Sequence, residues 1–236
     1  TDTVTVSIVG NGPVFENANP TFTVSINQVL KDDLIVKLSG DHGTVTIKAG
    51  ETSATYTAPI QGDDVYLDGG PLSVTIVDAS VPGKVFEDLQ LSKVPGVVQI
   101  NDTTSEVTAT LTVDKTSVVE GGSITYTVTL KGPDGIAVGN HAPLTFTLSD
   151  GSKITVEANS LTGSITVPVV NNDYVTGPIV TSITSVTGDE QFEKLTLNDG
   201  TVSTTVVDTP DTVTVSIAGN GDVFENAAPT FTVSIN

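Results

Sequence analysis

Apolar and polar residues alternate along most of this chain, in short runs separated by Gly, Asp, Asn and Pro. Such alternation places every second side chain on the same face of an extended strand, which makes one face apolar and the other polar. Val, Thr and Ile dominate the runs, as is typical of strands, and no useful length has the spacing of an amphipathic helix. The apolar positions include Val4/Val6/Ile8, Phe22/Val24/Ile26, Val45/Ile47 and Leu72/Val74/Ile76, then Leu111/Val113, Tyr126/Val128/Leu130, Ile154/Val156 and Ile165/Val167.

One segment of the chain occurs twice. Residues 2–27, DTVTVSIVGNGPVFENANPTFTVSIN, return at residues 211–236 with differences only at Val9/Ala218, Pro13/Asp222 and Asn19/Ala228. The shift of 209 residues, from 2 to 211, far exceeds the roughly 20 to 50 residues of repeats that cannot fold singly. We therefore expect self-sufficient domains, and a chain that is part of a longer tandem array.

A weaker repeat divides this unit in two. Val14-Phe15-Glu16 recurs as Val118-Val119-Glu120, a shift of 104 residues, and Phe86-Glu87 recurs as Phe192-Glu193, a shift of 106. The true unit is about 105 residues, enough to bury roughly two thirds of its unfolded surface. Around seven strands per unit, with one apolar face each, predict an all-β fold of tandem immunoglobulin-like antiparallel β-sandwiches.

The repeat also predicts the domain boundaries. We expect one sandwich at residues 1–103, a second at 104–209, and the N-terminal fragment of a third at 210–236. The junctions are short and lack a Gly/Ser tract, which favours a stiff rod. We expect the fragment to be either poorly ordered or paired with another edge strand, because a complete domain would bury its apolar residues. These are Val213, Val215, Ile217, Phe224, Phe231, Val233 and Ile235.

The charge and composition of the chain limit the classes of binding partner that it can have. The formal net charge is −19, from 28 acidic and 9 basic residues, whereas nucleic acid and anionic membranes require a cationic face. We therefore expect no nucleic-acid partner and, since no apolar run approaches the length of a bilayer, no direct membrane insertion. No charged and then apolar leader opens the sequence, so we expect a soluble segment whose targeting signal lies elsewhere. Cys is absent, so disulfides and thiolate sites are excluded and a bound cation is a natural alternative staple.

Acidic residues recur at matching places in each repeat. A Glu precedes the second strand, an acidic or amide cluster follows a mid-domain strand, and an Asp ends each repeat. In a sandwich these places can meet at one pole, where Ca²⁺, which prefers oxygen ligands, would relieve the repulsion between carboxylates. Since neither His nor Cys occurs in the clusters, zinc and copper fit poorly. The residues are Glu16, Asp63, Asp64, Asp68 and Asp102, then Glu120, Asn171, Asn172, Asp173 and Asp208, with Asp211 and Glu225 expected near Asp208 at the next junction.

The order of these motifs resembles the Calx-beta domain, in which such acids bind Ca²⁺ at one pole. Acidic, Thr/Val-rich, Cys-free tandem units of this length also resemble the extender repeats of large type I secreted RTX adhesins of the LapA kind. The resemblance implies Ca²⁺ ligation by Glu16, Asp63, Asp64, Asp68 and Asp102 in the first repeat. In the second repeat it implies the same role for Glu120, Asp173 and Asp208.

The sequence departs from the Calx-beta pattern in several places. Single Asp residues, rather than several consecutive ones, close each repeat, and Gly177 aligns with Asp68, so we expect the second site to be weaker. Glu87 and Glu193 can support the metal pole or lie on the polar face of a strand, and the second interpretation is favoured. The RTX nonapeptide GGxGxDxUx does not occur, so any secretion domain must lie outside this sequence.

No constellation predicts catalysis. His42 and His141 lie in turn-like segments at positions that are not equivalent, and neither a Ser-His-Asp order nor a P-loop recurs. We therefore expect a non-enzymatic, extracellular stalk segment of a bacterial surface adhesin, stiffened by Ca²⁺ between neighbouring repeats and supporting biofilm formation. The adhesion target stays open. The alternatives are a weak glycan- or protein-binding module acting by avidity, for which Tyr66 and Tyr174 are the nearest candidates, and an accessory spacer of an extracellular enzyme.

Overall fold

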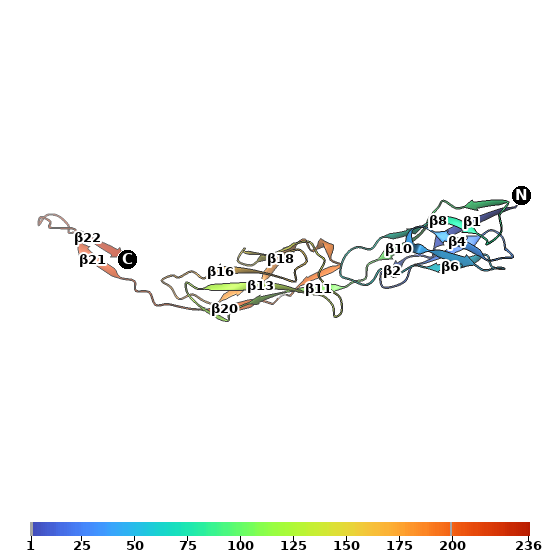
Figure 1. Ribbon diagram of the computed structural model, residues 1–236. Coiled ribbons are helices and arrows are strands. Elements are labelled where there is room, and N and C mark those ends of the chain that lie inside the picture. The colour runs from blue at the N-terminus through green and yellow to red at the C-terminus, as the bar shows by residue number, and fades with distance from the viewer. Residues whose placement is uncertain (1, 199) are drawn as a thin grey trace. The chain divides into compact units, whose positions relative to one another are not determined.

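The computed structural model describes residues 2–198 and 200–236, and strands form most of its regular structure (Figure 1). The alternation in the sequence is the alternation of burial. In β1 (Thr3–Gly10), Val4, Val6 and Ile8 are buried, whereas Thr5 is exposed and Ser7 is partly exposed. The all-β, immunoglobulin-like sandwich class is thereby confirmed. Among the described residues, no helix has the length and apolar character needed to cross a membrane.

The first sandwich consists of three hydrogen-bonded sheets. Their strand orders are β6-β3-β1-β9, β2-β10-β7 and β5-β4-β8. Besides β1, the strands are β2 (Val14–Phe15), β3 (Thr21–Ile26), β4 (Leu34–Leu38), β5 (Thr44–Ile47), β6 (Ser53–Thr57), β7 (Pro71–Val74), β8 (Ile76–Ser80), β9 (Asp88–Leu91) and β10 (Gly96–Asn101). Apolar residues from the strands, including Phe22, Val24, Leu34, Val36 and Val98, form one buried core.

The second sandwich repeats this topology strand for strand, with orders β16-β13-β11-β19, β12-β20-β17 and β15-β14-β18. Phe146 and Leu144 are fully buried in its core. Its strands are β11 (Glu106–Val113), β12 (Ser117–Val119), β13 (Ser123–Lys131), β14 (Leu144–Leu148), β15 (Lys153–Val156), β16 (Thr162–Pro168), β17 (Ile179–Thr181), β18 (Ile183–Thr187), β19 (Lys194–Leu197) and β20 (Val202–Val207). Short 3-10 helices occur at Gly40–His42 and Asp189–Gln191.

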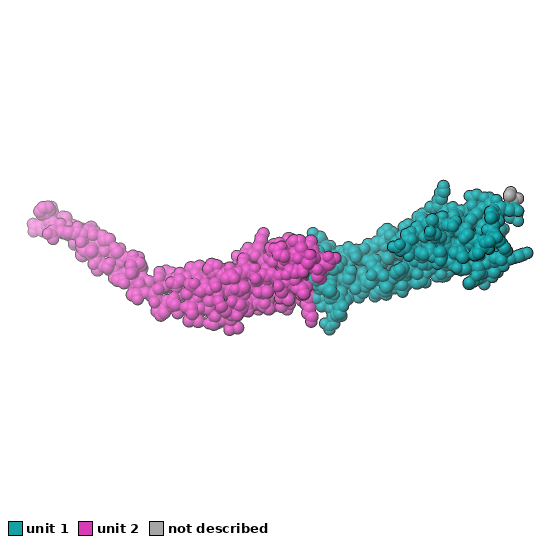
Figure 2. Space-filling model, viewed as in Figure 1, with its two compact units in different colours: residues 1–107, 132–138, 189–196 teal, residues 108–131, 139–188, 197–236 magenta. Residues whose placement is uncertain are grey.

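The chain divides into two compact units, coloured separately in Figure 2. Unit 1 contains residues 1–107 together with 132–138 and 189–196. Unit 2 contains residues 108–131, 139–188 and 197–236. Unit 1 therefore includes two segments that come from the sequence of the second sandwich, and one of them reaches the acidic residues described below.

The final residues form a hairpin of β21 (Val215–Gly219) and β22 (Phe231–Ile235). Its antiparallel register, Val215↔Ile235, corresponds to Val6↔Ile26 between β1 and β3. The two strands pair with each other, and whether a further edge strand joins them stays a prediction. The apolar residues whose counterparts are buried in the first sandwich are exposed here by 43% to 69%.

Candidate metal centre

The parallel pairing of β2 with β10 positions the first acidic residue. Val14 pairs with Ile100 and Phe15 with Asn101, and the N–H of Glu16 donates to the carbonyl of Asn101 at 2.9 Å. Alternation then turns Phe15 outward and the Glu16 side chain inward, where it is 0% exposed. Residues far apart in the sequence are thereby brought together, because Asp102 directly follows β10.

Glu16 is only partly satisfied by hydrogen bonds. Its Oε1 accepts from the N–H of Thr103 at 3.1 Å and from the Thr103 hydroxyl at 3.0 Å. Its Oε2 is buried and has no hydrogen-bond partner among the described residues. Burying an unpaired carboxylate oxygen is costly, so such an atom indicates a site that a cation or a proton completes.

Glu16 belongs to a first group of carboxylates with Asp64 and Asp68. One oxygen from each lies within 4.8 Å of the others. Asp64 Oδ1 accepts from the N–H of Tyr66 at 2.6 Å, and Asp68 Oδ1 accepts from Gln61 Nε2 at 2.6 Å. Burial, followed by the negative charges of the neighbouring carboxylates, raises the pKa of Asp68. The group therefore resists carrying its full negative charge in the absence of a cation.

A second group shares Glu16 and adds Asp102 and Glu193, again with oxygens within 4.8 Å of one another. Asp102 Oδ1 accepts from the N–H groups of Asp68 at 3.1 Å and Gly69 at 2.5 Å. A Cβ atom on Gly69 would lie 2.8 Å from that oxygen. Glycine is therefore required here to let the backbone approach the carboxylate.

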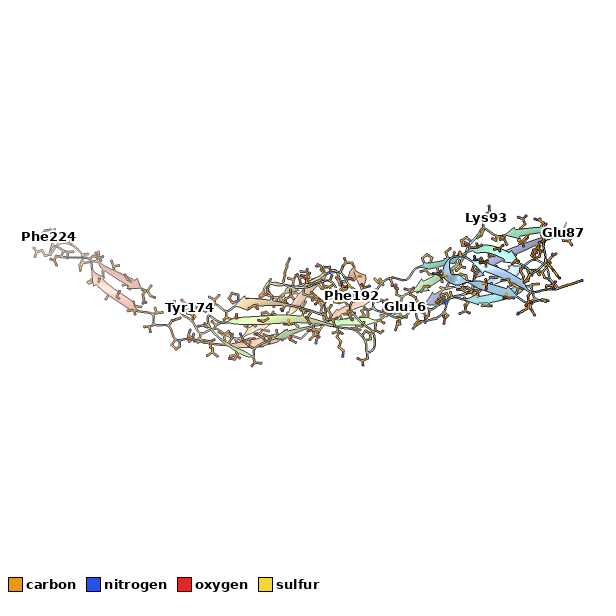
Figure 3. All side chains as sticks on the ribbon, in the orientation of Figure 1. Glu16, Glu87, Lys93, Tyr174, Phe192 and Phe224 are labelled. Atoms are coloured by element: carbon orange, nitrogen blue, oxygen red, sulfur yellow. The ribbon has the colours of Figure 1, made fainter. Side chains whose placement is uncertain are left out.

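Glu193 belongs to the segment 189–196 of unit 1, and Figure 3 labels its neighbour Phe192. The N–H of Glu193 donates to the carbonyl of Val65 at 3.0 Å, and the N–H of Leu67 donates to the carbonyl of Gln191 at 3.0 Å. Between these bonds the rings of Tyr66 and Phe192 stack with centroids 5.4 Å apart. A short two-stranded contact thus fixes Glu193 beside Glu16.

The interpretation of Glu193 as a polar-face residue of a strand is therefore wrong. Its Oε2 accepts from the N–H of Ser105, while its Oε1 is buried with no partner among the described residues. Burial raises the pKa of Glu193 to about 7. The hydrogen bond from Ser105 lowers this pKa, whereas the negative charges of Glu16 and Asp102 raise it further. The signal in the sequence was the recurrence of Phe-Glu at residues 86–87 and 192–193.

Asp63 lies outside both carboxylate groups. It is exposed and accepts a hydrogen bond from the Thr103 hydroxyl, which also donates to Glu16. Asp63 therefore holds Thr103, and through it orients the Glu16 carboxylate. Asp63 therefore positions Thr103 and is not itself a member of the carboxylate groups.

The corresponding pole of the second sandwich has a different chemistry. Glu120 is 6% exposed, like Glu16, but its Oε1 accepts from Asn172 Nδ2 at 3.4 Å and from the Thr176 hydroxyl at 3.0 Å. Its Oε2 accepts from the N–H of Thr209 at 3.5 Å. Neutral donors thus occupy the places that Asp64 and Asp68 take in the first sandwich.

The structural correspondence also corrects the sequence alignment of this loop. The N–H of Tyr174 donates to Asn172 Oδ1 at 2.9 Å, just as that of Tyr66 donates to Asp64. Thr176, two residues after the tyrosine, therefore matches Asp68, and the match of Gly177 with Asp68 is wrong by one residue. Gly177 corresponds to Gly69.

The remaining predicted acids lie around this second pole or beyond it. Burial, followed by the negative charges of Glu120 and Asp211, raises the pKa of Asp208. Asp211 Oδ2 also accepts from Asn171 at 3.5 Å. Asp173 and Glu225 are both exposed, and neither belongs to the carboxylate groups found among the described residues.

The two histidines make structural contacts away from these groups. His42 Nδ1 lies 2.9 Å from the hydroxyl of Tyr56. His141 is 3% exposed, with its two ring nitrogens 2.7 Å and 2.6 Å from the carbonyls of Ala142 and Ser160. His141 therefore ties two loop segments of unit 2 together.

The donor set defines the chemistry available at the first pole. It consists of carboxylate oxygens, two of them buried and unpaired, on Glu16 and Glu193. Hard cations with many oxygen ligands, Ca²⁺ above all, match this set, and soft metals do not. Glu16, Asp64, Asp68, Asp102 and Glu193 are the residues that could hold the ion.

The fold and the poles define a class of protein: tandem all-β sandwiches with acidic residues gathered at a sandwich end. More particularly, the chain belongs to the LapA domain family, whose model matches residues 2–103 and 106–209. No curated protein has a sequence that matches the chain.

Solved structures of low identity resemble it. A tetra-tandem repeat in the extending region of a large adhesion protein is 14% identical over 99% of this chain and 55% of that one, with a TM-score of 0.37. CBD12 from CALX1.2 is 11% identical over 86% and 99%, with a TM-score of 0.35. Adhesin InvE of Yersinia pseudotuberculosis is 16% identical over 85% and 58%, with a TM-score of 0.31. These scores are too low to support an inference about function.

Proposed function

We propose that this chain is a structural extender segment of a bacterial surface adhesin, in which Ca²⁺ bound at the acidic pole of the first sandwich stiffens the junction between neighbouring repeats. Membership of the LapA domain family over both repeats supports the extender role. The observation that carries the Ca²⁺ proposal is the buried, unpaired Oε2 of Glu16 within two groups of carboxylates.

The ion would act by replacing repulsion with attraction. Glu16, Asp102 and Glu193 come from separate parts of the sequence. Their carboxylates repel one another when all three are ionised. A divalent cation among them joins the segment that carries Glu193 to the pole that carries Glu16. The junction then behaves as a rigid link, which suits a stalk that holds a distal adhesive module away from the cell.

The supply of Ca²⁺ fits a function outside the cell. Extracellular Ca²⁺ modules bind at about 10⁻⁴ to 10⁻³ M, so such sites fill outside the cell and stay empty at cytosolic concentrations. A cation at 100 times its Kd adds about 2.7 kcal/mol to the free energy of unfolding. We therefore propose an extracellular location, with folding completed after export and a role in adhesion and biofilm formation.

Calorimetry tests the ion directly. The melting temperature of the chain is measured in excess EDTA and in millimolar CaCl₂, with MgCl₂ at the same ionic strength as the control. We expect Ca²⁺ to raise it by several degrees and Mg²⁺ to have little effect, because Mg²⁺ dehydrates reluctantly and requires a tighter octahedron. Equal melting in EDTA and CaCl₂ would exclude the proposed ion.

The avidity alternative has weaker support. A binding module that acts by avidity requires exposed aromatic residues at equivalent positions of both repeats. Tyr174 is 79% exposed, but its counterpart Tyr66 is partly buried and stacks on Phe192. The two repeats therefore do not present equivalent exposed tyrosines to which the same ligand could bind.

A further inference from the structure

The opposite end of the first sandwich carries a second copy of the segment that closes the acidic pole. Phe86-Glu87 corresponds to Phe192-Glu193, and Figure 3 places Glu87 and Glu16 at opposite ends of unit 1. The N–H of Asp2 donates to Glu87 Oε2 at 3.1 Å, which is the same bond that Ser105 makes with Glu193. The segment around Phe86 therefore already has the arrangement used in the observed contact.

This copy of the segment is uncovered. Val85 is 97% exposed, and Phe86 is half-buried, whereas the counterpart Phe192 is only 3% exposed beneath Tyr66. A pocket of about 140 Å³ lies beside it, with the apolar residues Leu30, Val81, Val85 and Phe86 and the charged residues Lys31, Asp32 and Lys84 in its lining. The surface around Phe86 therefore resembles one side of a protein interface whose partner surface is missing.

The second sandwich carries a matching half that is equally uncovered. Tyr174 is 79% exposed and Val175 is 85% exposed, in the loop that corresponds to Tyr66 and Leu67. The bond from the Tyr174 N–H to Asn172 Oδ1 gives this loop the same local turn as the one around Tyr66. Exposed apolar side chains of this size favour burial against a complementary surface.

We infer that residues 173–176 of one chain dock on residues 84–87 of a second copy, in the antiparallel register observed between Tyr66 and Phe192. In this register Tyr174 lies opposite Phe86, and Val175 lies opposite Val85. The main chain supplies two further bonds, from Val175 N–H to the Val85 carbonyl and from Glu87 N–H to the Asp173 carbonyl. The same pairing forms the alternate junction wherever a repeat of the first kind follows one of the second.

The residue at one position of the proposed interface is unfavourable for docking. Replacing it should therefore strengthen the association between the two chains. Asp173 takes the place of Val65, whose carbonyl accepts from Glu193, and therefore lies opposite Glu87. Two like charges across a strand pair are destabilising. The substitution Asp173→Val removes this repulsion and restores the apolar residue of the observed contact, so it should tighten the association severalfold.

The chain is free of Cys, which makes disulfide trapping selective. A Val85→Cys chain is mixed with a Val175→Cys chain of different mass, and the mixture is oxidised in excess EDTA. A Val180→Cys chain, whose site is also exposed in unit 2, is the matched control. We expect the 85–175 heterodimer to form at least about tenfold faster than the 85–180 heterodimer, since a specific register raises the local concentration of one pair.

Variants of the mixed chains connect trapping to the proposed contacts. Phe86→Ala should reduce the 85–175 yield about tenfold, because truncating a central aromatic residue of an interface typically costs more than 1 kcal/mol. Asp173→Val should increase the yield. Equal yields at 175 and 180, or a preference for 85–85 homodimers, would overturn the inference. Because EDTA is present throughout, the result is independent of whether Ca²⁺ binds at Glu16.

Discussion

The poles of the two sandwiches have the same strands and the same buried glutamate but satisfy that glutamate differently. Glu16 lies among carboxylates and keeps an unpaired oxygen, whereas Glu120 accepts from the neutral donors Asn172 and Thr176. The first pole thus gathers carboxylates around an unpaired oxygen, whereas the second pole satisfies its glutamate with hydrogen bonds from neutral groups. Under the proposed function, ion-dependent and ion-independent junctions alternate along the repeats while the fold stays the same.

The largest expected effect follows from removing the shared carboxylate. Glu16→Gln should abolish the stabilisation by Ca²⁺, about 2.7 kcal/mol at 100 times Kd, while leaving stability in EDTA unchanged or higher. The amide removes a buried charge from the group and adds a donor for Asp102 or Asp64. Calorimetry in CaCl₂ and in EDTA measures the difference.

Glu120→Gln is the matched control for this prediction. Because Glu120 already has neutral partners, we expect its replacement to leave the Ca²⁺ response intact. A Ca²⁺ response lost equally in both variants would show that the two poles do not differ in the proposed way.

The next effect comes from the close approach at Gly69. Gly69→Ala places a Cβ atom 2.8 Å from Asp102 Oδ1, and overpacking of this kind costs typically 1 to 3 kcal/mol, here about 2 kcal/mol. A Cβ atom on the counterpart Gly177 would meet no atom of the described residues within 4 Å. Gly177→Ala should therefore change stability little, and equal losses in thermal unfolding would contradict the comparison.

A smaller effect concerns pH in the absence of Ca²⁺. The pKa of Glu193 is raised to about 7 in the folded chain, above the ordinary value of 4.5, so its contribution is fully present below pH 4.5 and is lost as pH rises through about 7. We expect unfolding in EDTA to become easier by about 1 kcal/mol between pH 5 and 8, after discounting for solvent screening.

Substituting Glu193 isolates this pH response. Glu193→Gln should flatten the profile in EDTA, because the side chain no longer titrates, and Ca²⁺ should flatten it in the original chain. A slope unchanged by the substitution would assign the response to other groups.

An effect of similar size is expected from converting the second pole into the first. Asn172→Asp with Thr176→Asp replaces two neutral donors to Glu120 by carboxylates. Without Ca²⁺ we expect a loss of about 1 kcal/mol from like-charge repulsion, and with Ca²⁺ a gain that the original pole lacks. Isothermal titration should then detect additional Ca²⁺ bound per chain, and an unchanged count would contradict the exchange.

The sequence by itself determined the strands, because alternation is a local property that Val4, Val6 and Ile8 already display. It also determined the repeat and the acids at matching places, including Glu16 and Asp102. Only the tertiary structure decided which acids meet. Glu193 joins Glu16 because residues 189–196 pack beside Tyr66, and Glu120 is hydrogen-bonded because Asn172 and Thr176 turn toward it. Such meetings depend on register and loop closure over long separations, which no local pattern of residues contains.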